Sequence, residues 1–93
     1  MLRDPRLDAI ADAHRARTGD EAVLLATLLL AEETGEVVQQ TRRFMGRARR
    51  TATAADVGAE LADVLISAAI LARLLDVDLE EGVDAKLSLG IRE

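Results

Sequence analysis

The stretch LLLAEETGEVVQQ, residues 28–40, places three glutamates at the edge of a strongly apolar segment. The ten residues from Ala22 to Ala31 contain only one polar side chain, a threonine. A carboxylate beside apolar surface is costly unless a partner compensates its charge. Both the fold and the function therefore depend on what pairs with Glu32, Glu33 and Glu36.

The composition predicts one small cytoplasmic domain over residues 1–93. A chain of this length buries only about 60–65% of its unfolded surface, so an isolated fold would be marginal. The chain has no cysteine, no apolar stretch typical of an export signal, and no apolar run near the ~20 residues of a membrane-spanning helix. We therefore expect a soluble protein without a membrane partner. Its net charge of -5 and its single aromatic residue, Phe44, argue against a nucleic-acid partner.

The sequence predicts an all-α fold. It is rich in alanine, leucine, arginine and glutamate, contains one proline, and shows no sustained period-two alternation. Asp4-Pro5 is typical of a helix start, Thr53 with Asp56 resembles a capping box, and Asp78 with Glu81 repeats that pattern. Four helices are expected: from Asp4-Pro5 to within Arg17–Asp20, from about Asp20 to about Met45, from Thr53 to about Leu75, and from Asp78 to about Leu89.

The two long helices are expected to form an antiparallel hairpin. The loop between them, Gly46–Ala52, is short, and short connections usually join antiparallel neighbours. Both helices carry apolar residues on more than one face, and such helices must be buried on all sides. The two short helices are too small to cover this surface. The prediction is a helical hairpin with flanking short helices, packed with other copies into an oligomeric four-helix-type bundle, either a dimer or a tetramer.

The hairpin brings two carboxylate pairs together. Glu33 and Glu36 are three residues apart on one helix face, and Glu60 and Asp63 repeat that spacing on the other helix. With a turn centred near Arg49, we expect Glu36 level with Asp63, so that four carboxylates converge within roughly 10 Å.

Converging carboxylates repel one another and lose hydration, so they need a cation. An oxygen-only donor set suits Mg²⁺, or alternatively Mn²⁺. A ferritin-like di-iron centre would need a histidine three residues after a glutamate, and the sole histidine, His14, lies in another helix. The glycine-centred loop of an EF-hand calcium site is absent. The sequence therefore predicts a magnesium site.

The two carboxylate motifs resemble those of the MazG-like, all-α nucleotide pyrophosphohydrolases. EETGE (residues 32–36) followed by ELADVLISAAILA (residues 60–72) matches that family's order of two adjacent glutamates, a third glutamate three residues on, a spacer, and then a glutamate and an aspartate three apart. The resemblance covers the two long helices well and the last helix more loosely. It implies hydrolysis of a nucleoside triphosphate, NTP or dNTP, between its α and β phosphates, which yields a monophosphate and pyrophosphate.

The resemblance also implies roles for individual residues. The Mg²⁺ ligands would be Glu33, Glu36, Glu60 and Asp63. Glu32 would orient or deprotonate the attacking water, or it would contact the metal ligands without binding the metal itself.

The family's last helix carries a lysine that holds phosphates, and Lys86 matches it. Gly90 and Asp84 depart from the residues usual around that lysine, and Arg92 is a candidate for the phosphate contact in their place. His14 is a candidate for contact with the base, or a packing residue of the first helix.

We therefore expect a Mg²⁺-dependent nucleoside triphosphate pyrophosphohydrolase that clears non-standard or surplus nucleotides. The alternative is a non-catalytic helical module, for example a dimeric regulator related to that family. A weaker alternative is that the arginine block of residues 42–50 contacts nucleic acid, against which the acidic net charge argues.

Overall fold

The chain folds into helices joined by short connections. The computed structural model describes residues 1–90, and within this range it contains no β-strand. The elements in chain order are α1 (Pro5–Thr18), the single-turn 3₁₀ helix η1 (Gly19–Glu21), α2 (Ala22–Phe44), α3 (Ala54–Leu74) and α4 (Leu79–Leu89). The all-α prediction is confirmed.

Side-chain caps define where three of the helices begin. Asp4 accepts a hydrogen bond from the Arg6 amide at 2.8 Å, directly before the proline that opens α1. At the start of α3, Thr53 and Asp56 form a reciprocal capping box: the Asp56 amide donates to the Thr53 hydroxyl at 3.2 Å, and the Thr53 amide donates to the Asp56 carboxylate at 2.8 Å. Each cap satisfies amides that the first helical turn leaves without partners.

One helix boundary and one cap differ from the sequence-based expectation. The second helix was expected from about Asp20, but η1 occupies residues 19–21 and α2 begins at Ala22. Gly19 has φ +52°, a left-handed conformation that ends α1 and that glycine adopts without steric cost. At α4 only half of the expected capping box forms, because Asp78 accepts from the Glu81 amide at 3.0 Å but no reciprocal bond from the Glu81 side chain is present in the described chain.

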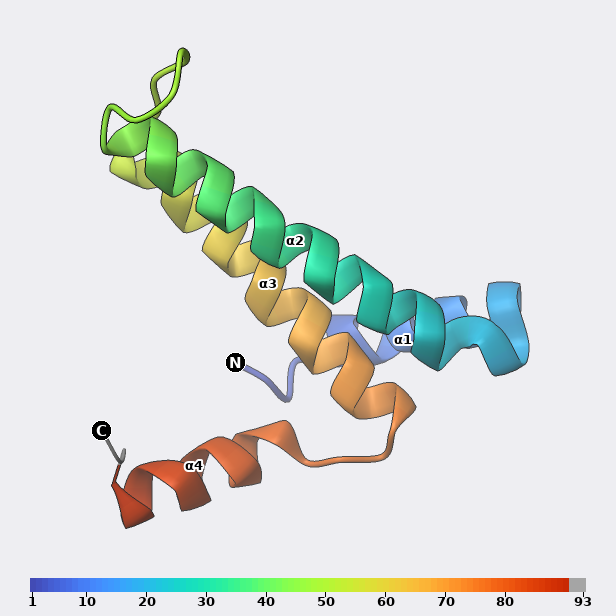
Figure 1. Cartoon of the computed structure of the whole chain (residues 1–93). Helices are drawn as coiled ribbons and strands as arrows, with labels where there is room; N and C mark the ends of the chain where they lie inside the picture. Colours follow the sequence, from blue (N-terminus) through green and yellow to red (C-terminus); the bar gives the residue numbers. More distant parts are fainter. Residues whose placement is uncertain (91–93) are drawn as a thin grey trace.

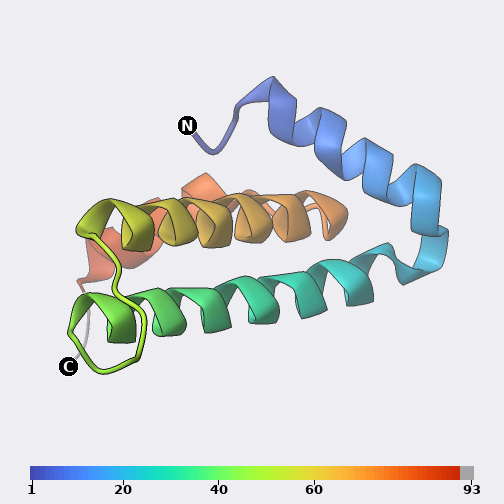
Figure 2. The same cartoon turned by 90° about the horizontal axis from the view of Figure 1, so that it is seen from above.

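Helices α2 and α3 form the predicted antiparallel hairpin. They run side by side along most of their lengths, and the loop of residues 45–53 joins them at one end (Figures 1 and 2). Gly46, with φ +75°, lies in this loop, where its amide donates to the Arg43 carbonyl at 3.1 Å. The hairpin provides two long, closely packed helices on which the carboxylates are placed.

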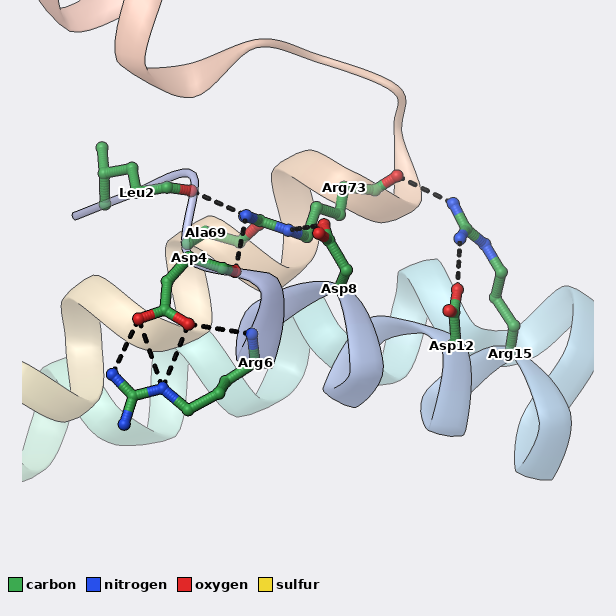
Figure 3. A network of polar contacts seen from close by, with 8 residues as sticks. All are labelled: Leu2, Asp4, Arg6, Asp8, Asp12, Arg15, Ala69 and Arg73. Atoms are coloured by element: carbon green, nitrogen blue, oxygen red, sulfur yellow. Dashed lines mark hydrogen bonds and ion pairs between the residues drawn. The ribbon is translucent and has the colours of Figure 1, made fainter.

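Helix α1 packs against α3 near the end of the hairpin opposite the loop (Figure 1). Arg73 of α3 fixes it there, as Figure 3 shows. The Arg73 guanidinium donates to the Asp8 carboxylate at 2.6 Å and to the Leu2 carbonyl at 2.7 Å. It also contacts the Ala69 carbonyl at 3.2 Å and the Asp4 carbonyl at 3.4 Å. One side chain thus joins α3 to both the N-terminal segment and α1.

Helix α4 lies apart from α2 and meets the rest of the chain through its first turn (Figure 1). Arg3 forms ion pairs with Asp78 at 3.0 Å and with Glu80 at 3.3 Å, and Leu79 packs against the hydrophobic core. Residues 81–90 are exposed. The first turn of α4 is therefore held mainly by the N-terminal segment.

The core of the single chain is small. Its buried apolar residues are Leu2, Leu7, Ala11, Ala22, Ala26, Ala69, Ile70 and Ala72. Five of these eight are alanines, which contribute little apolar area. Much larger side chains remain exposed, including Leu24 (54%), Leu28 (57%) and Leu61 (54%). The Cα radius of gyration is 15.3 Å, against about 12 Å for a compact domain of this length. The single chain is thus open and leaves much apolar surface in contact with water.

Candidate metal centre

Three glutamates meet in the middle of the hairpin. Glu33 and Glu36, one turn apart on α2, and Glu60 on α3 each offer a carboxylate oxygen, and these oxygens lie within 4.8 Å of one another. The three-residue spacing places Glu33 and Glu36 on the same face of α2. The structure therefore brings together three of the four carboxylates that the sequence suggested as ligands.

Asp63, the fourth predicted ligand, lies at the edge of this cluster. Its side chain is more exposed than those of Glu33 and Glu60, and its charge helps to raise the pKa of both. The sequence predicts that Glu36 is level with Asp63, whereas the structure brings Glu36 together with Glu33 and Glu60.

Two carboxylate oxygens in the cluster have no hydrogen-bond partner. Glu33 Oε2 and Glu60 Oε2 are both shielded from solvent, and neither is bonded to any group of the described chain. A buried polar oxygen without a partner carries the full cost of its lost hydration. These two oxygens, one from each helix of the hairpin, are therefore suited to a cation between them.

Burial and mutual repulsion change the acidity of the cluster. The pKa of Glu33 is raised, first by desolvation and then by the charges of Glu36, Asp63 and Glu32. The pKa of Glu60 is also raised, again first by desolvation, then by its contact with Glu36 and by the charges of Glu36, Asp63 and Glu33. Both shifts have the same physical cause: negative charge is concentrated where water cannot solvate it.

These pKa shifts predict how the stability of the metal-free protein depends on pH. A carboxyl group whose pKa is raised on folding contributes stability below its unfolded pKa, and this contribution is lost as the pH rises through the folded pKa. The capping aspartates Asp4, Asp56 and Asp78 have lowered pKa values, about 2 for Asp4, so their contributions are constant above pH ~5. Glu33 and Glu60 therefore dominate the carboxylate contribution in that range.

We expect the metal-free protein to melt at a lower temperature at pH ~7.5 than at pH ~5.5. Thermal unfolding in the presence of a chelator measures this difference. In the Glu60→Gln variant the difference should shrink, because one of the two groups no longer titrates. A melting temperature that rises with pH in the wild-type protein would contradict the interpretation.

The donor set agrees with a hard divalent cation. It consists of carboxylate oxygens only, without a sulfur or imidazole ligand. Mg²⁺ is commonly held by a few carboxylates while water or phosphate oxygens complete its coordination. The residues present thus fit Mg²⁺ or Mn²⁺ better than they fit zinc.

The other predicted site residues lie elsewhere or cannot be placed. Glu32 is exposed on α2 beside Glu33, and its charge acts on that residue. Lys86 lies on the exposed part of α4, and no hydrogen bond or ion pair within residues 1–90 joins it to the cluster. His14 is half-buried on α1, where its carbonyl accepts from the Thr18 hydroxyl at 2.8 Å. Arg92 lies outside the described residues.

Sequence reasoning did not identify the role of Arg73. It is the only cation within α3, and the structure directs it toward α1, where it pairs with Asp8. The two residues are 65 positions apart, and no local pattern in the sequence indicates their pairing.

An apolar groove of about 430 Å³ lies on another side of α3. Its lining includes Leu2, Leu7 and Ile10 from the N-terminal segment and α1, and Leu65 and Ile66 from α3. None of the clustered glutamates lines it. The groove is therefore separate from the carboxylates and forms part of the exposed apolar surface of the chain.

No helix within residues 1–90 combines the length and the apolar character needed to cross a lipid bilayer. The chain has no significant match among curated proteins or among solved structures. The family model of the MazG nucleotide pyrophosphohydrolase domain matches residues 22–88, a range that contains α2, α3 and most of α4. This range covers more than half of the chain and includes every clustered carboxylate. The chain therefore belongs to the MazG nucleotide pyrophosphohydrolase family.

Proposed function

We propose that this protein is a Mg²⁺-dependent enzyme that hydrolyses a nucleoside triphosphate to the monophosphate and pyrophosphate. The observation that carries the proposal is the convergence of Glu33, Glu36 and Glu60, with two buried oxygens that no group within residues 1–90 satisfies. Membership of the pyrophosphohydrolase family supports the same reaction class. The proposed substrates include both NTPs and dNTPs. The corresponding cellular role is the clearing of surplus or non-standard nucleotides.

In this proposal Glu33, Glu36, Glu60 and Asp63 hold the cation, with Mn²⁺ as the substitute for Mg²⁺. A bound Mg²⁺ would polarise the phosphoryl oxygens and neutralise the charge that develops on them during phosphoryl transfer. A bound cation would also reverse the local charge, because the acidic cluster alone would repel a polyphosphate. The ligands come from both helices of one hairpin, so the packing of α2 against α3 sets their geometry.

Glu32 is the proposed group that orients or deprotonates the attacking water. It is exposed, so a water molecule can reach it, and it directly precedes a proposed metal ligand in the sequence. The residues proposed to contact the phosphates and the base are Lys86, Arg92 and His14.

We also propose that the enzyme is a cytoplasmic homo-oligomer, a dimer or a tetramer. The small alanine-rich core and the exposed leucines of α2 and α3 support this, because a second copy would bury apolar surface that the single chain leaves exposed. The groove between α1 and α3 belongs to that surface. Sedimentation equilibrium tests the proposal: a mass of 10.0 kDa would mean that the protein is a monomer.

A panel of NTPs and dNTPs with Mg²⁺ tests the proposed reaction. We expect pyrophosphate release from at least one nucleotide, no release in the presence of a chelator, and recovery when Mg²⁺ or Mn²⁺ is restored. Assays for pyrophosphate and for orthophosphate, run in parallel, identify the bond that is cleaved. If every nucleotide survives with both metals, the enzyme proposal fails and the non-catalytic module is favoured.

A further inference from the structure

Among residues 1–90, no cationic side chain is paired with the carboxylate cluster. Within residues 1–90 the ion pairs of arginine side chains join Arg3, Arg6, Arg15 and Arg73 to acids outside the cluster. A nucleoside triphosphate carries more negative charge than one divalent cation neutralises. A site that holds it therefore gains from a fixed cation within reach of the phosphates.

The register of α2 places Arg43 on the same helix face as Glu36. The two residues are seven positions apart, which is about two turns and roughly 10 Å along the axis. The accessibilities agree with this placement, because Arg43 is half-buried whereas its neighbour Arg42 is exposed. Arg43 thus continues the inward face of α2, between the cluster and the loop.

The guanidinium of Arg43 is uncommitted in the described chain. Its neighbour Arg42 donates to the Arg47 carbonyl at 3.2 Å and so supports the loop. Asp56, the acid at the start of α3, is engaged by the Thr53 amide at 2.8 Å and the Thr53 hydroxyl at 3.1 Å. No hydrogen bond or ion pair of the Arg43 side chain occurs within residues 1–90. Its five N–H donors are therefore free for a ligand.

We propose that Arg43 binds the terminal phosphate of the nucleotide whose inner phosphates are held at the carboxylate cluster. This inference rests on the proposed function and assigns an additional substrate-positioning residue to it. The planar guanidinium can donate two parallel hydrogen bonds to one phosphate. It also fixes the direction of the substrate: the terminal phosphate points toward the loop, and the nucleoside lies toward the end of the hairpin where α1 packs (Figure 1).

Calorimetric titration in saturating Mg²⁺ tests this assignment. The ligands are the α,β-methylene analogue of the best substrate of the panel, which cannot be cleaved between those phosphates, and the corresponding nucleoside monophosphate. Arg43→Ala should weaken binding of the triphosphate analogue roughly tenfold to a hundredfold and leave monophosphate binding unchanged. Arg43→Lys should recover part of the loss, since lysine keeps the charge but not the planar fork.

Arg50→Ala is the matched control. It removes the same charge from an exposed position of the loop and should keep the wild-type affinity for both ligands. Three results would overturn the assignment. They are unchanged triphosphate binding by Arg43→Ala, an equal loss of affinity for the triphosphate analogue and the monophosphate in Arg43→Ala, or a loss of triphosphate affinity in Arg50→Ala equal to that in Arg43→Ala. Failure of the wild-type protein to bind either nucleotide would instead overturn the proposed function. The two failures are thus distinguishable, and unchanged monophosphate binding by Arg43→Ala also shows that this variant is folded.

Discussion

The Glu36→Gln variant should lose pyrophosphohydrolase activity by roughly a hundredfold or more while its metal-free fold becomes no less stable. Glutamine keeps the size of the side chain but removes one charged ligand from the proposed metal site. The same change relieves repulsion, because the charge of Glu36 raises the pKa of both Glu33 and Glu60. Activity and stability should therefore change in opposite directions, as is common where function imposes strain.

Two measurements check this prediction: the rate of pyrophosphate release at saturating Mg²⁺, and thermal unfolding in the presence of a chelator. The matched control is Glu21→Gln, which removes an equal charge from an exposed position outside the cluster. That variant should keep its activity and show little change in melting temperature. Near-normal activity of Glu36→Gln would contradict the proposed role of this residue as a ligand.

The second large effect concerns the packing of α1. Arg73→Ala should lower the free energy of unfolding by about 2–3 kcal/mol, because it removes several hydrogen bonds from a charged donor, including the one to the Leu2 carbonyl. The Arg73 side chain is 18% exposed, whereas its partner Asp8 is 62% exposed. The expected loss of stability is therefore smaller than the loss caused by breaking a fully buried ion pair. Figure 3 shows the Arg73 guanidinium between the N-terminal segment, α1 and α3, where it contacts the Asp8 carboxylate and the carbonyls of Leu2, Asp4 and Ala69.

Urea unfolding of the wild type, Arg73→Ala and Arg73→Lys measures this effect. Lysine keeps the charge but lacks the branched guanidinium that contacts several acceptors at once, so it should recover only a minor part of the stability. Asp8→Asn provides a further comparison and should cost less than Arg73→Ala, because the bonds from Arg73 to the carbonyls remain. Equal stability of Arg73→Ala and the wild type would contradict this role and would show that other contacts, such as the bond from Arg15 to the Arg73 carbonyl, hold α1.

Local signals in the sequence were sufficient to predict the helices. Asp4-Pro5 and the reciprocal pair Thr53 and Asp56 act through hydrogen bonds between residues close in sequence, so the chain alone specifies them. The hairpin followed from the short loop between two apolar helices. The 3₁₀ turn at residues 19–21 was not predicted, because it depends on the left-handed conformation of Gly19 at the end of α1.

The site was only partly predictable. Helix periodicity placed Glu33 and Glu36 on one face, and the hairpin brought Glu60 to them, as the structure confirms. The exact alignment of Glu36 with the carboxylates of α3 depends on the conformation of the loop, which no local pattern in the sequence specifies. The role of Arg73 was beyond sequence reasoning, since its contacts arise only from tertiary packing of residues far apart in the chain.

The location of α4 was equally difficult to predict. Its first turn follows from the cap at Asp78, but that residue also pairs with Arg3 from the other end of the chain. This ion pair helps set where α4 lies, and no local pattern encodes it. Whether Lys86 contacts phosphates therefore stays a prediction.

The central claim is that the carboxylate cluster supports metal-dependent cleavage between the α and β phosphates. Phosphorus NMR of a substrate nucleotide incubated with the protein and Mg²⁺ in water enriched in oxygen-18 tests it most directly. We predict signals of the monophosphate and of pyrophosphate, with the isotope shift on the monophosphate if water attacks the α phosphorus. Orthophosphate with a nucleoside diphosphate, or products that form equally fast with Glu36→Gln, would contradict the claim.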